Sequence, residues 1–448
     1  MEFQAVIFAA GIGTRFRDIV ASRPKCLLPV GSFPLIFYPL NFCSKYGFEE
    51  VIIIVLESQK TEIAQRVSKL PLKMKYDFVC LNQEEDYGTA DALRLVADRI
   101  KTDVLLISCD TITDVDFYPL LNLFRTNDAS CVALFDSGSE ENSNNIVVPG
   151  VKAKHKAERD LVGIDSKNNR LLFLASTTDF QDNFSLPAHL LRSFGEVDIY
   201  SNLTDAHMYL IKHWVINYIS KSEKFSTIKG ELLPFIIKKQ LSKPPAAVTN
   251  RGLNISEVNF DTNDIFDHIE RAELEKRIQE TNLSPKSYSK KSKNSEMIKC
   301  FAYVAPQNSF CMRINTILNY CIINKKIASL LTDFNLPLIS KNATIKSTQI
   351  TDCCVAENCT IAEKTSIKNT IFGIGCHIEQ RTRINDSILM SNVNVEEGVK
   401  LENCIICDKA TIKMGSTLKN CLVGHNFIVT ENTIKERVHL TGEGFMEI

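Results

Sequence analysis

Apolar residues in the first half of the chain fall in short continuous runs that alternate with segments of helical periodicity. The runs Phe3 to Phe8, Glu50 to Leu56 and Asp103 to Ser108 are rich in Val, Ile and Leu, as strands buried on both faces require. Between them, Leu35 to Tyr46 and Thr61 to Leu70 have the spacing of helices. This alternation predicts a Rossmann-like, three-layer α/β domain with a parallel sheet covered on both faces.

The last hundred residues follow a different rule, because apolar and Asx positions recur every 17 residues. Inward aliphatic residues about six positions apart, three in each repeat, are typical of a parallel β-helix built from hexapeptide units. Asp and Asn suit the turns, since their short side chains bond neighbouring backbone groups. The repeat predicts five coils. Its columns are Ile350, Ile367, Ile384, Leu401 and Leu418; Ile361, Ile378, Val395, Ile412 and Val429; Val355, Phe372, Leu389, Ile406 and Val423; and the Asx residues Asp352, Asn369, Asp386, Asn403 and Asn420.

These patterns divide the chain into four parts. Residues 1–250 are the α/β domain, and residues 341–448 are the β-helix with a C-terminal tail. Residues 251–300 are a charged, partly disordered linker, and residues 301–340 are expected to be a helical connector. The two larger parts are each long enough for a hydrophobic core of their own.

The segment between the two domains has little to bury. Ser284 to Lys299 contains five Lys and one Glu among Ser, Asn and Pro, a net charge of +4. It is either a flexible tether or a contact for RNA or an acidic partner, and its polarity favours the tether. Upstream, Ile265 to Glu280 is expected to be a charged helix. Ser137 to Asp160, polar and without periodicity, is expected to be a surface excursion of the first domain.

Charge and hydropathy exclude several classes of protein. Lys and Arg number 52 against 53 for Asp and Glu, so there is no net field to attract nucleic acid or an anionic membrane. The longest apolar stretches are far shorter than the roughly 20 residues that span a bilayer, and the first three residues lack a basic signal-peptide start. We therefore expect a soluble, cytosolic protein without membrane contact or direct nucleic-acid binding.

The fifteen cysteines are better explained as reduced core residues than as a disulfide framework. Cys404 and Cys407 form a C-x-x-C pair, a spacing that binds zinc in other contexts. Here Cys404 shares a repeat column with Cys353 and Cys421, and no second pair lies at matching spacing. Packing inside the β-helix is therefore favoured over metal binding.

A candidate phosphate-binding loop follows the first strand. Gly11 and Gly13 allow the backbone to approach a phosphate closely, and the N–H groups of the next turn favour an anion. Arg15 and Lys25 are placed to neutralise the phosphate oxygens. A dinucleotide-binding loop would need Gly or Ala at position 16, where this chain has Phe16, and the Walker pattern is absent.

The loop and its surroundings resemble the signature of the sugar-nucleotide pyrophosphorylase family. The resemblance is carried by Phe8 to Arg15, by Pro24 and Lys25 and by Leu28 to Val30, together with the hexapeptide repeat. It implies a nucleotidyltransferase-like domain followed by a left-handed parallel β-helix. It also implies nucleotide contacts at Gly11, Gly13, Thr14, Arg15, Lys25, Gln83, Gly88 and Thr89 and a magnesium-binding carboxylate at Asp110.

Two segments depart from the pattern of active members of that family. Where those enzymes carry a Glu-Lys-Pro segment whose lysine meets the sugar phosphate, this chain has Arg170 to Ser176 without such a lysine. Where they carry Asn-Ala-Gly before a Tyr, the sequence is Asp205 to Tyr209, with His207 at a place where only Gly leaves space for a sugar. We therefore expect that sugar transfer is lost, that no residue is catalytic, and that Arg15, Lys25 and the metal ligand Asp110 are vestigial.

The same departures, with Ile107 to Asp110 and Phe445 to Ile448, are similar to the family of gamma subunits of eukaryotic translation initiation factor 2B. This resemblance implies a non-catalytic subunit of the exchange complex that promotes GDP release from initiation factor 2. It implies the catalytic epsilon subunit and the other subunits of that complex as partners. Because stacked coils present flat sides and an open end to another solenoid, the aliphatic residues Ile428 and Val429 of the last coil are candidate contacts; alternatively, the tail from Glu431 to Ile448 caps them. No cofactor is required, and GTP or ATP with Mg²⁺ is the expected ligand if the cleft still binds a nucleotide.

Two alternatives remain open on the sequence alone. The chain is an active sugar-1-phosphate nucleotidyltransferase if the departures are tolerated, or a free-standing sensor that binds a nucleotide or sugar nucleotide through the glycine loop. Turnover of a sugar-1-phosphate by the purified chain would favour the first alternative. Nucleotide binding by the isolated chain would favour the second.

Overall fold

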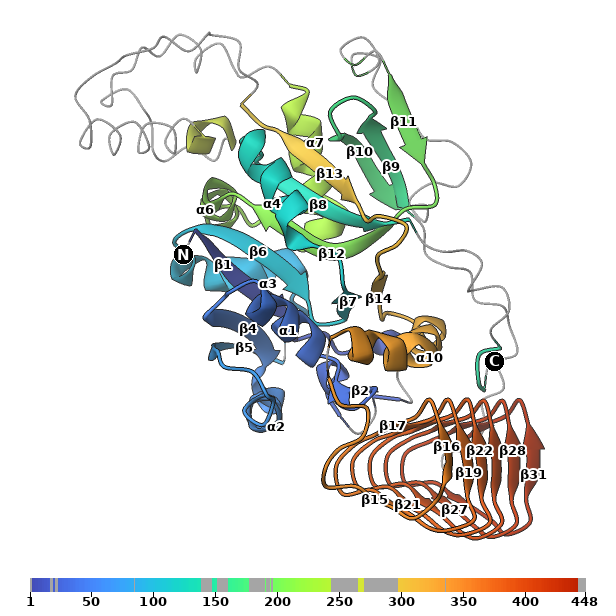
Figure 1. The fold of residues 1–448 in the computed structure, drawn as a ribbon. Helices are drawn as coiled ribbons and strands as arrows, with labels where there is room; N and C mark the ends of the chain where they lie inside the picture. Colours follow the sequence, from blue (N-terminus) through green and yellow to red (C-terminus); the bar gives the residue numbers. More distant parts are fainter. Residues whose placement is uncertain are drawn as a thin grey trace, which may run out of the picture.

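The chain has two domains joined through one long helix. In the computed structural model, helix α10 (Ile317–Asp333) lies between an N-terminal α/β domain and a C-terminal β-helix (Figure 1). The structure describes residues 2–16, 19–20, 23–83, 85–137, 147–150, 160–176, 190, 194, 196–242, 265–269, 297–334 and 336–441.

A ten-stranded sheet is the centre of the described N-terminal domain, in the order β11-β9-β10-β13-β8-β12-β6-β1-β4-β5. The four strands from β6 to β5 are parallel, as the continuous apolar runs predict. The strands are β1 Phe3–Phe8, β4 Glu50–Leu56, β5 Lys75–Leu81, β6 Asp103–Ser108, β8 Cys131–Asp136, β9 Asp160–Asp165, β10 Arg170–Ser176, β11 Val197–Tyr200, β12 Thr204–Ile211 and β13 Cys300–Val304.

The rest of the sheet corrects two expectations. Strand β12 runs antiparallel to both β6 and β8, so the sheet is mixed and not wholly parallel. Strand β13 lies inside the sheet, parallel to β8 and antiparallel to β10, although residues 301–340 were expected to be only a helical connector. A five-residue strand that pairs with partners more than a hundred positions away leaves no local periodicity to detect.

Helices cover both faces of the sheet and make the three predicted layers. Along β1 the side chains alternate, with Val6 packed in one apolar cluster and Ala5 and Ile7 in the other. No helix in the described part of the chain is long and apolar enough to span a bilayer. Helices α3 Thr89–Val96, α6 His213–Lys221 and α7 Leu233–Gln240 cover the first face, and α1 Phe37–Lys45, α2 Lys60–Val67 and α4 Phe117–Thr126 the second.

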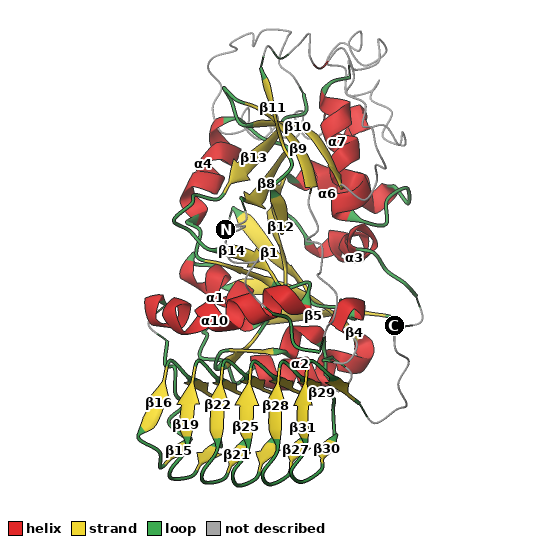
Figure 2. Cartoon of the chain, turned by 90° about the vertical axis from the view of Figure 1, so that its right-hand side faces the viewer, coloured by secondary structure: helices red, strands yellow, loops and turns green. Residues whose placement is uncertain are grey.

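The C-terminal domain is a parallel β-helix whose described residues form three six-stranded sheets, seen as stacked rungs in Figure 2. From Gln349 onward, partners in neighbouring coils are 17 residues apart, for example Ile361 with Ile378, which confirms the predicted register. The first strand, β15, is 16 residues from its partner β18. The sheets contain β15 Thr344–Ile345, β18 Thr360–Ile361, β21 His377–Ile378, β24 Asn394–Val395, β27 Thr411–Ile412 and β30 Ile428–Val429; β16 Gln349–Thr351, β19 Ser366–Lys368, β22 Arg383–Asn385, β25 Lys400–Glu402, β28 Thr417–Lys419 and β31 Ile434–Glu436; and β17 Cys354–Val355, β20 Ile371–Phe372, β23 Ile388–Leu389, β26 Ile405–Ile406, β29 Leu422–Val423 and β32 His439–Leu440.

Left-handed backbone at the turns explains the column of Asx residues. All five residues of that column have φ between +47° and +52°, a region that Asn and Asp tolerate better than other side chains. The column continues to Arg437, because the chain makes a sixth coil with β31 and β32 where a tail was expected from Glu431 onward. The prediction of five coils was therefore one coil short.

One of the two predicted partner contacts on β30 is wrong. Val429 is buried in the inward column with Ile412, whereas Ile428 beside it is 59% exposed. Successive strand residues point to opposite sides, so two neighbours cannot both face a partner.

The cysteines confirm the packing interpretation, since all fifteen are free thiols and fourteen of them are buried. Cys404 belongs to the apolar interior of the β-helix, whereas Cys407 belongs to the cluster outside the coil wall. The two thiols of the C-x-x-C pair therefore face different environments.

Apolar packing and an ion pair fix the β-helix to the N-terminal domain. The outward residues of the β17 sheet, among them Ile371 and Ile405, pack in one cluster with Ile327 of α10 and with Val30 of the α/β domain. Arg23 forms a bidentate, largely buried ion pair with Asp408, with its Nε 2.6 Å from Oδ2. Because Arg23 precedes Lys25 by two positions, the same segment contacts both the β-helix and the candidate phosphate site.

Several sequence-based expectations lie largely outside the described residues. Of the predicted helix Ile265 to Glu280, residues 265–269 are described and are helical. Most of Ser137 to Asp160 and of the basic segment Ser284 to Lys299 is not described, nor are residues 442–448.

Candidate functional site

A cavity of about 340 Å³ opens where β1 and β6 end. Parallel strands of α/β domains present their carboxyl ends to ligands, so this is the expected edge for a site. The cavity is lined by Phe8, Gly11, Gly13, Thr14, Arg15, Phe16, Lys25, Thr89, Ser108, Cys109, Asp110, His207, Tyr209, Ile228, Arg313 and Asn315.

The glycine loop and Lys25 meet as predicted. Gly13 has a φ of +70°, and a Cβ added there would lie 3.3 Å from the Cβ of Lys25, so the loop folds tightly over that side chain. Phe16, almost fully buried, has its ring centre 5.6 Å from the Lys25 Nζ, a cation–π distance. Phe16, which argues against a dinucleotide-binding loop, thus packs against the Lys25 ammonium group.

Asp110 is the buried anion of the cavity, with 1% of its surface exposed. Its Oδ1 accepts hydrogen bonds from Ser108 Oγ at 2.6 Å and from Arg313 Nε at 3.0 Å, and its Oδ2 accepts one from the Lys25 ammonium. Burial alone would raise the pKa of the carboxyl group. The charges of Arg313 and Lys25 outweigh burial and hold that pKa well below its ordinary value, so Asp110 is ionised.

Arg313 is the functional-site residue that sequence reasoning missed. It ends β14 (Cys311–Arg313), which pairs antiparallel with β7 (Thr111–Thr113), so that Arg313 lies opposite Thr111 and beside Asp110. The amide of Ile314 also donates to the carbonyl of Asp110 at 2.8 Å. The contact joins positions 203 residues apart, and no local motif announces it.

His207 occupies a strained position where β12 bulges against β8. Its φ is +51°, and Asp205 holds the bulge by accepting from the His207 amide at 2.8 Å and the Tyr209 hydroxyl at 2.5 Å. His207 thus adopts a left-handed backbone conformation, which favours glycine over residues with a Cβ. The histidine side chain points to Arg313, whose Nη1 lies 2.9 Å from its Nε2.

The guanidinium contact fixes the state of the imidazole. Because a guanidinium can only donate, Nε2 of His207 accepts from Arg313 and the ring proton lies on Nδ1. Burial, and then the positive charge of Arg313, lower the pKa of His207 well below its ordinary value of 6.5. His207 is therefore neutral at physiological pH.

This depressed pKa makes a testable pH dependence. Below about pH 6.5 the unfolded chain binds a proton at His207 that the folded chain does not, so the free energy of unfolding falls by up to about 1.4 kcal/mol per pH unit. His207→Asn, which keeps a residue tolerant of positive φ, should remove that part of the slope. Urea unfolding at pH 7.5 and 5.5, followed by the fluorescence of Trp214 on α6, measures it. The exposed His377 supplies a control, His377→Gln, and equal slopes for wild type and His207→Asn would refute the assignment.

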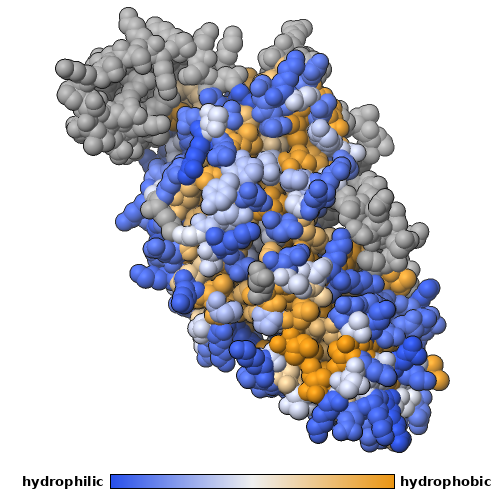
Figure 3. Space-filling view, viewed as in Figure 1, coloured by the Kyte–Doolittle hydropathy of each residue, from blue (hydrophilic) through white to orange (hydrophobic). Residues whose placement is uncertain are grey.

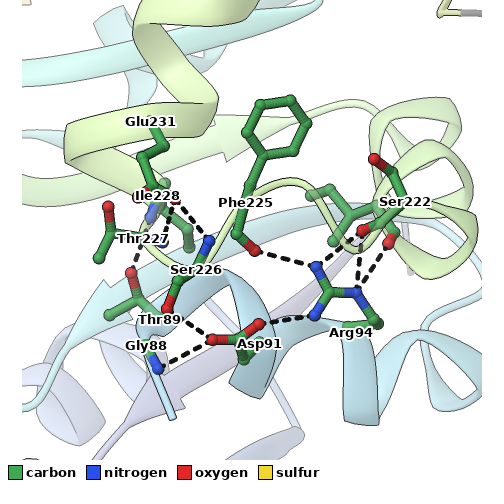
Figure 4. A network of polar contacts seen from close by, with 11 residues as sticks. Gly88, Thr89, Asp91, Arg94, Ser222, Phe225, Ser226, Thr227, Ile228 and Glu231 are labelled. Atoms are coloured by element: carbon green, nitrogen blue, oxygen red, sulfur yellow. Dashed lines mark hydrogen bonds and ion pairs between the residues drawn. The ribbon is translucent and has the colours of Figure 1, made fainter. Parts of the chain in front are cut away.

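A polar network holds in place the segments that contribute Thr89 and Ile228 to the cavity lining (Figure 4). Arg94 of α3 donates to the carbonyls of Ser222 and Phe225 at 2.7 and 2.9 Å and pairs with Asp91 at 2.7 Å. Thr89 accepts from the amide of Ile228 at 2.8 Å, and both residues line the cavity. The N-terminus of α3 and residues 222–231 are therefore held as one unit.

The predicted nucleotide contacts are only partly gathered. Gly88 precedes Thr89 but does not line the cavity. It packs so closely against Ser226 that an added Cβ would be 2.1 Å from the Ser226 carbonyl oxygen. Gln83 is exposed and does not line the cavity. The structure brings together Gly11, Gly13, Thr14, Arg15, Lys25, Thr89 and Asp110. Their role in binding a nucleotide stays a prediction.

Comparisons with known proteins match both domains. A family model described as nucleotidyl transferase matches residues 4–148, and one described as the EIF2B subunit epsilon LbH domain matches residues 338–434. The eIF2B subunit gamma of Schizosaccharomyces pombe is 33% identical over 380 residues, which are 82% of this chain and 74% of the relative. The chain belongs to the eIF2B gamma family. The eIF2B subunit gamma of Dictyostelium discoideum is 27% identical over 83% of this chain and 87% of the relative.

The eIF2B gamma family also shares its N-terminal fold with enzymes. A heptose 1-phosphate guanylyltransferase of Campylobacter jejuni is 30% identical over 135 residues, 29% of this chain and 57% of that enzyme. The nucleotidyltransferase-like domain followed by a left-handed β-helix is thus confirmed, as is the predicted resemblance to eIF2B gamma subunits.

Proposed function

We propose that this chain is a non-catalytic subunit of the guanine nucleotide exchange complex that promotes GDP release from initiation factor 2. One observation carries the proposal. In the cavity of this eIF2B gamma family member, Lys25 and Arg313 both bind the carboxylate of Asp110, the expected metal ligand of an active enzyme. His207, bonded to Arg313, adds an imidazole where a sugar-transferring enzyme would need space. The solenoid fold of the C-terminal domain is suited to assembly with other subunits. We propose a cytosolic location for the protein because of its proposed role in translation.

We propose that the catalytic epsilon subunit is the direct partner, because the β-helix matches a model built on the epsilon subunit's own β-helix. Stacked coils end in strands whose edges are unpaired, and such edges favour a second solenoid. Among the described residues, β30 and β31 end their sheets, and Ile428 and Ile434 on them are 59% and 78% exposed. On the face shown in Figure 3, apolar residues also gather where α10 adjoins the β-helix.

The interface assignment predicts the effect of Ile428→Lys. Because Ile428 is exposed, the substitution should leave the chain folded, and because it places a charge in an apolar contact, it should weaken binding of the epsilon subunit about tenfold or more. Co-purification of the two co-expressed subunits, followed by titration, measures the effect. Leu95→Lys on α3, likewise a change from an exposed aliphatic residue to lysine, is the control that should bind normally. Normal binding by Ile428→Lys would remove this rung from the interface.

Reconstitution tests the function itself. The rate at which labelled GDP leaves initiation factor 2 should be higher with the complex that contains this chain than with the epsilon subunit alone. Recovery of the tagged chain from cells without a stoichiometric epsilon subunit, or exchange that is indifferent to its presence, would contradict the proposal.

A further inference from the structure

Both oxygens of the Asp110 carboxylate already have cationic partners. Oδ1 accepts from Ser108 Oγ at 2.6 Å and from Arg313 Nε at 3.0 Å, and Oδ2 accepts from Lys25 Nζ. Only 2% of the Asp110 side chain is exposed, against 10% for Lys25 and 21% for Arg313. The carboxylate is therefore enclosed by its partners and not open to the cavity solvent.

The donor set does not fit the divalent cation that a nucleotidyltransferase fold implies. Magnesium demands near-octahedral oxygen coordination, so it needs a carboxylate oxygen with a free approach and further oxygen ligands nearby. Asp110 offers no such oxygen while Lys25 and Arg313 are in place. Among the residues that the structure describes, no group of three or more His, Cys, Asp or Glu side chains converges there or elsewhere.

The local charge balance also opposes a metal. Lys25 and Arg313 together carry two positive charges against the single negative charge of Asp110, and neutral His207 adds none. The cluster thus has one net positive charge before any ion enters. A divalent cation that bound Asp110 would first have to displace Lys25 and Arg313 from the carboxylate. It would then be repelled by their two positive charges in a site of low dielectric constant.

We propose that Arg313 and Lys25 stand where the divalent cation of the nucleotidyltransferase fold would bind, and that they exclude divalent metals from Asp110. Arg313 reaches the carboxylate because β14 pairs with β7 directly after it. The guanidinium is always charged, so the counter-ion cannot dissociate as a metal can. The cavity keeps a fixed positive charge that depends on no metal. The inference concerns the site alone and would survive if the proposed partner were wrong.

Manganese binding to the purified full-length chain tests the inference, because Mn²⁺ replaces Mg²⁺ at oxygen sites and is counted by electron paramagnetic resonance. The wild type should show no Asp110-dependent Mn²⁺ site up to about 1 mM, the weak end of protein sites for hard divalent cations. The double variant Lys25→Ala/Arg313→Ala should gain one site, which a further Asp110→Asn substitution should remove.

Controls separate the inference from general effects of removing charge. Arg99 pairs with Asp77 on the exposed surface, and Arg99→Ala should gain no Mn²⁺ site. Trp214 fluorescence establishes that the N-terminal domain of each variant is folded. A wild-type Mn²⁺ site that Asp110→Asn abolishes would overturn the inference, and so would a folded double variant that gains no site. If the double variant does not fold, the wild-type and Asp110→Asn comparison decides alone.

Discussion

Ile412→Asp should disrupt the β-helix while leaving the α/β domain folded. Ile412 is fully buried in the inward column, stacked between Val395 and Val429 of the neighbouring coils. The substitution removes a buried aliphatic side chain and places an unpaired carboxylate in an apolar interior, at a combined cost of roughly 4 kcal/mol or more. Because each coil contacts only its neighbours, the damage should spread through the adjacent rungs.

Hydrogen exchange measured by mass spectrometry resolves this effect along the chain. Peptides from residues 395–429 should lose protection, whereas the unfolding transition reported by Trp214 in the α/β domain should remain. Ile428→Asp, the same chemical change at an exposed position one coil further on, should keep protection close to that of the wild type. Unchanged protection in Ile412→Asp would mean that the inward register is wrong.

Asp110→Asn should destabilise the α/β domain by about 3–5 kcal/mol, because it leaves Lys25 and Arg313 buried without their counter-ion. Replacing all three groups, in Lys25→Met/Asp110→Asn/Arg313→Met, should recover most of the loss, since no buried charge is then uncompensated. Urea unfolding followed by Trp214 fluorescence measures the free energy of each variant.

The exposed pair of Arg99 and Asp77 provides the comparison for this triad. Asp77→Asn should cost less than about 1 kcal/mol, because solvent screens a surface ion pair. An effect of Asp110→Asn as small as that of Asp77→Asn would show that the carboxylate is not held as the structure describes.

The sequence predicts those parts of the fold in which the pattern is local or strictly periodic. The strands Phe3–Phe8, Glu50–Leu56 and Asp103–Ser108 are found at the predicted bounds because buried parallel strands are continuous apolar runs. The 17-residue repeat predicts the register of the β-helix because each coil repeats the same inward positions. The sequence pattern does not predict the last coil, because Arg437 replaces Asx at its turn and β31 is exposed along its length.

The missed features are those that depend on pairing between distant segments. Strand β13 and Arg313 both come from the stretch after the linker, where the sequence shows only short elements. The sequence predicts a metal ligand at Asp110 and a phosphate contact at Lys25, yet only the folded chain brings these residues to each other and to Arg313. Chemistry-bearing residues are thus visible in a sequence before their partners are.

The central claim is that a nucleotidyltransferase cavity here serves a non-catalytic subunit. Pyrophosphate exchange by the purified chain and by its complex, with Mg²⁺, nucleoside triphosphates and sugar-1-phosphates, tests it most directly. The account predicts no label transfer above that of a Lys25→Ala/Asp110→Asn variant, although the same complex releases GDP from initiation factor 2. Robust transfer by the wild type that this variant abolishes would contradict it.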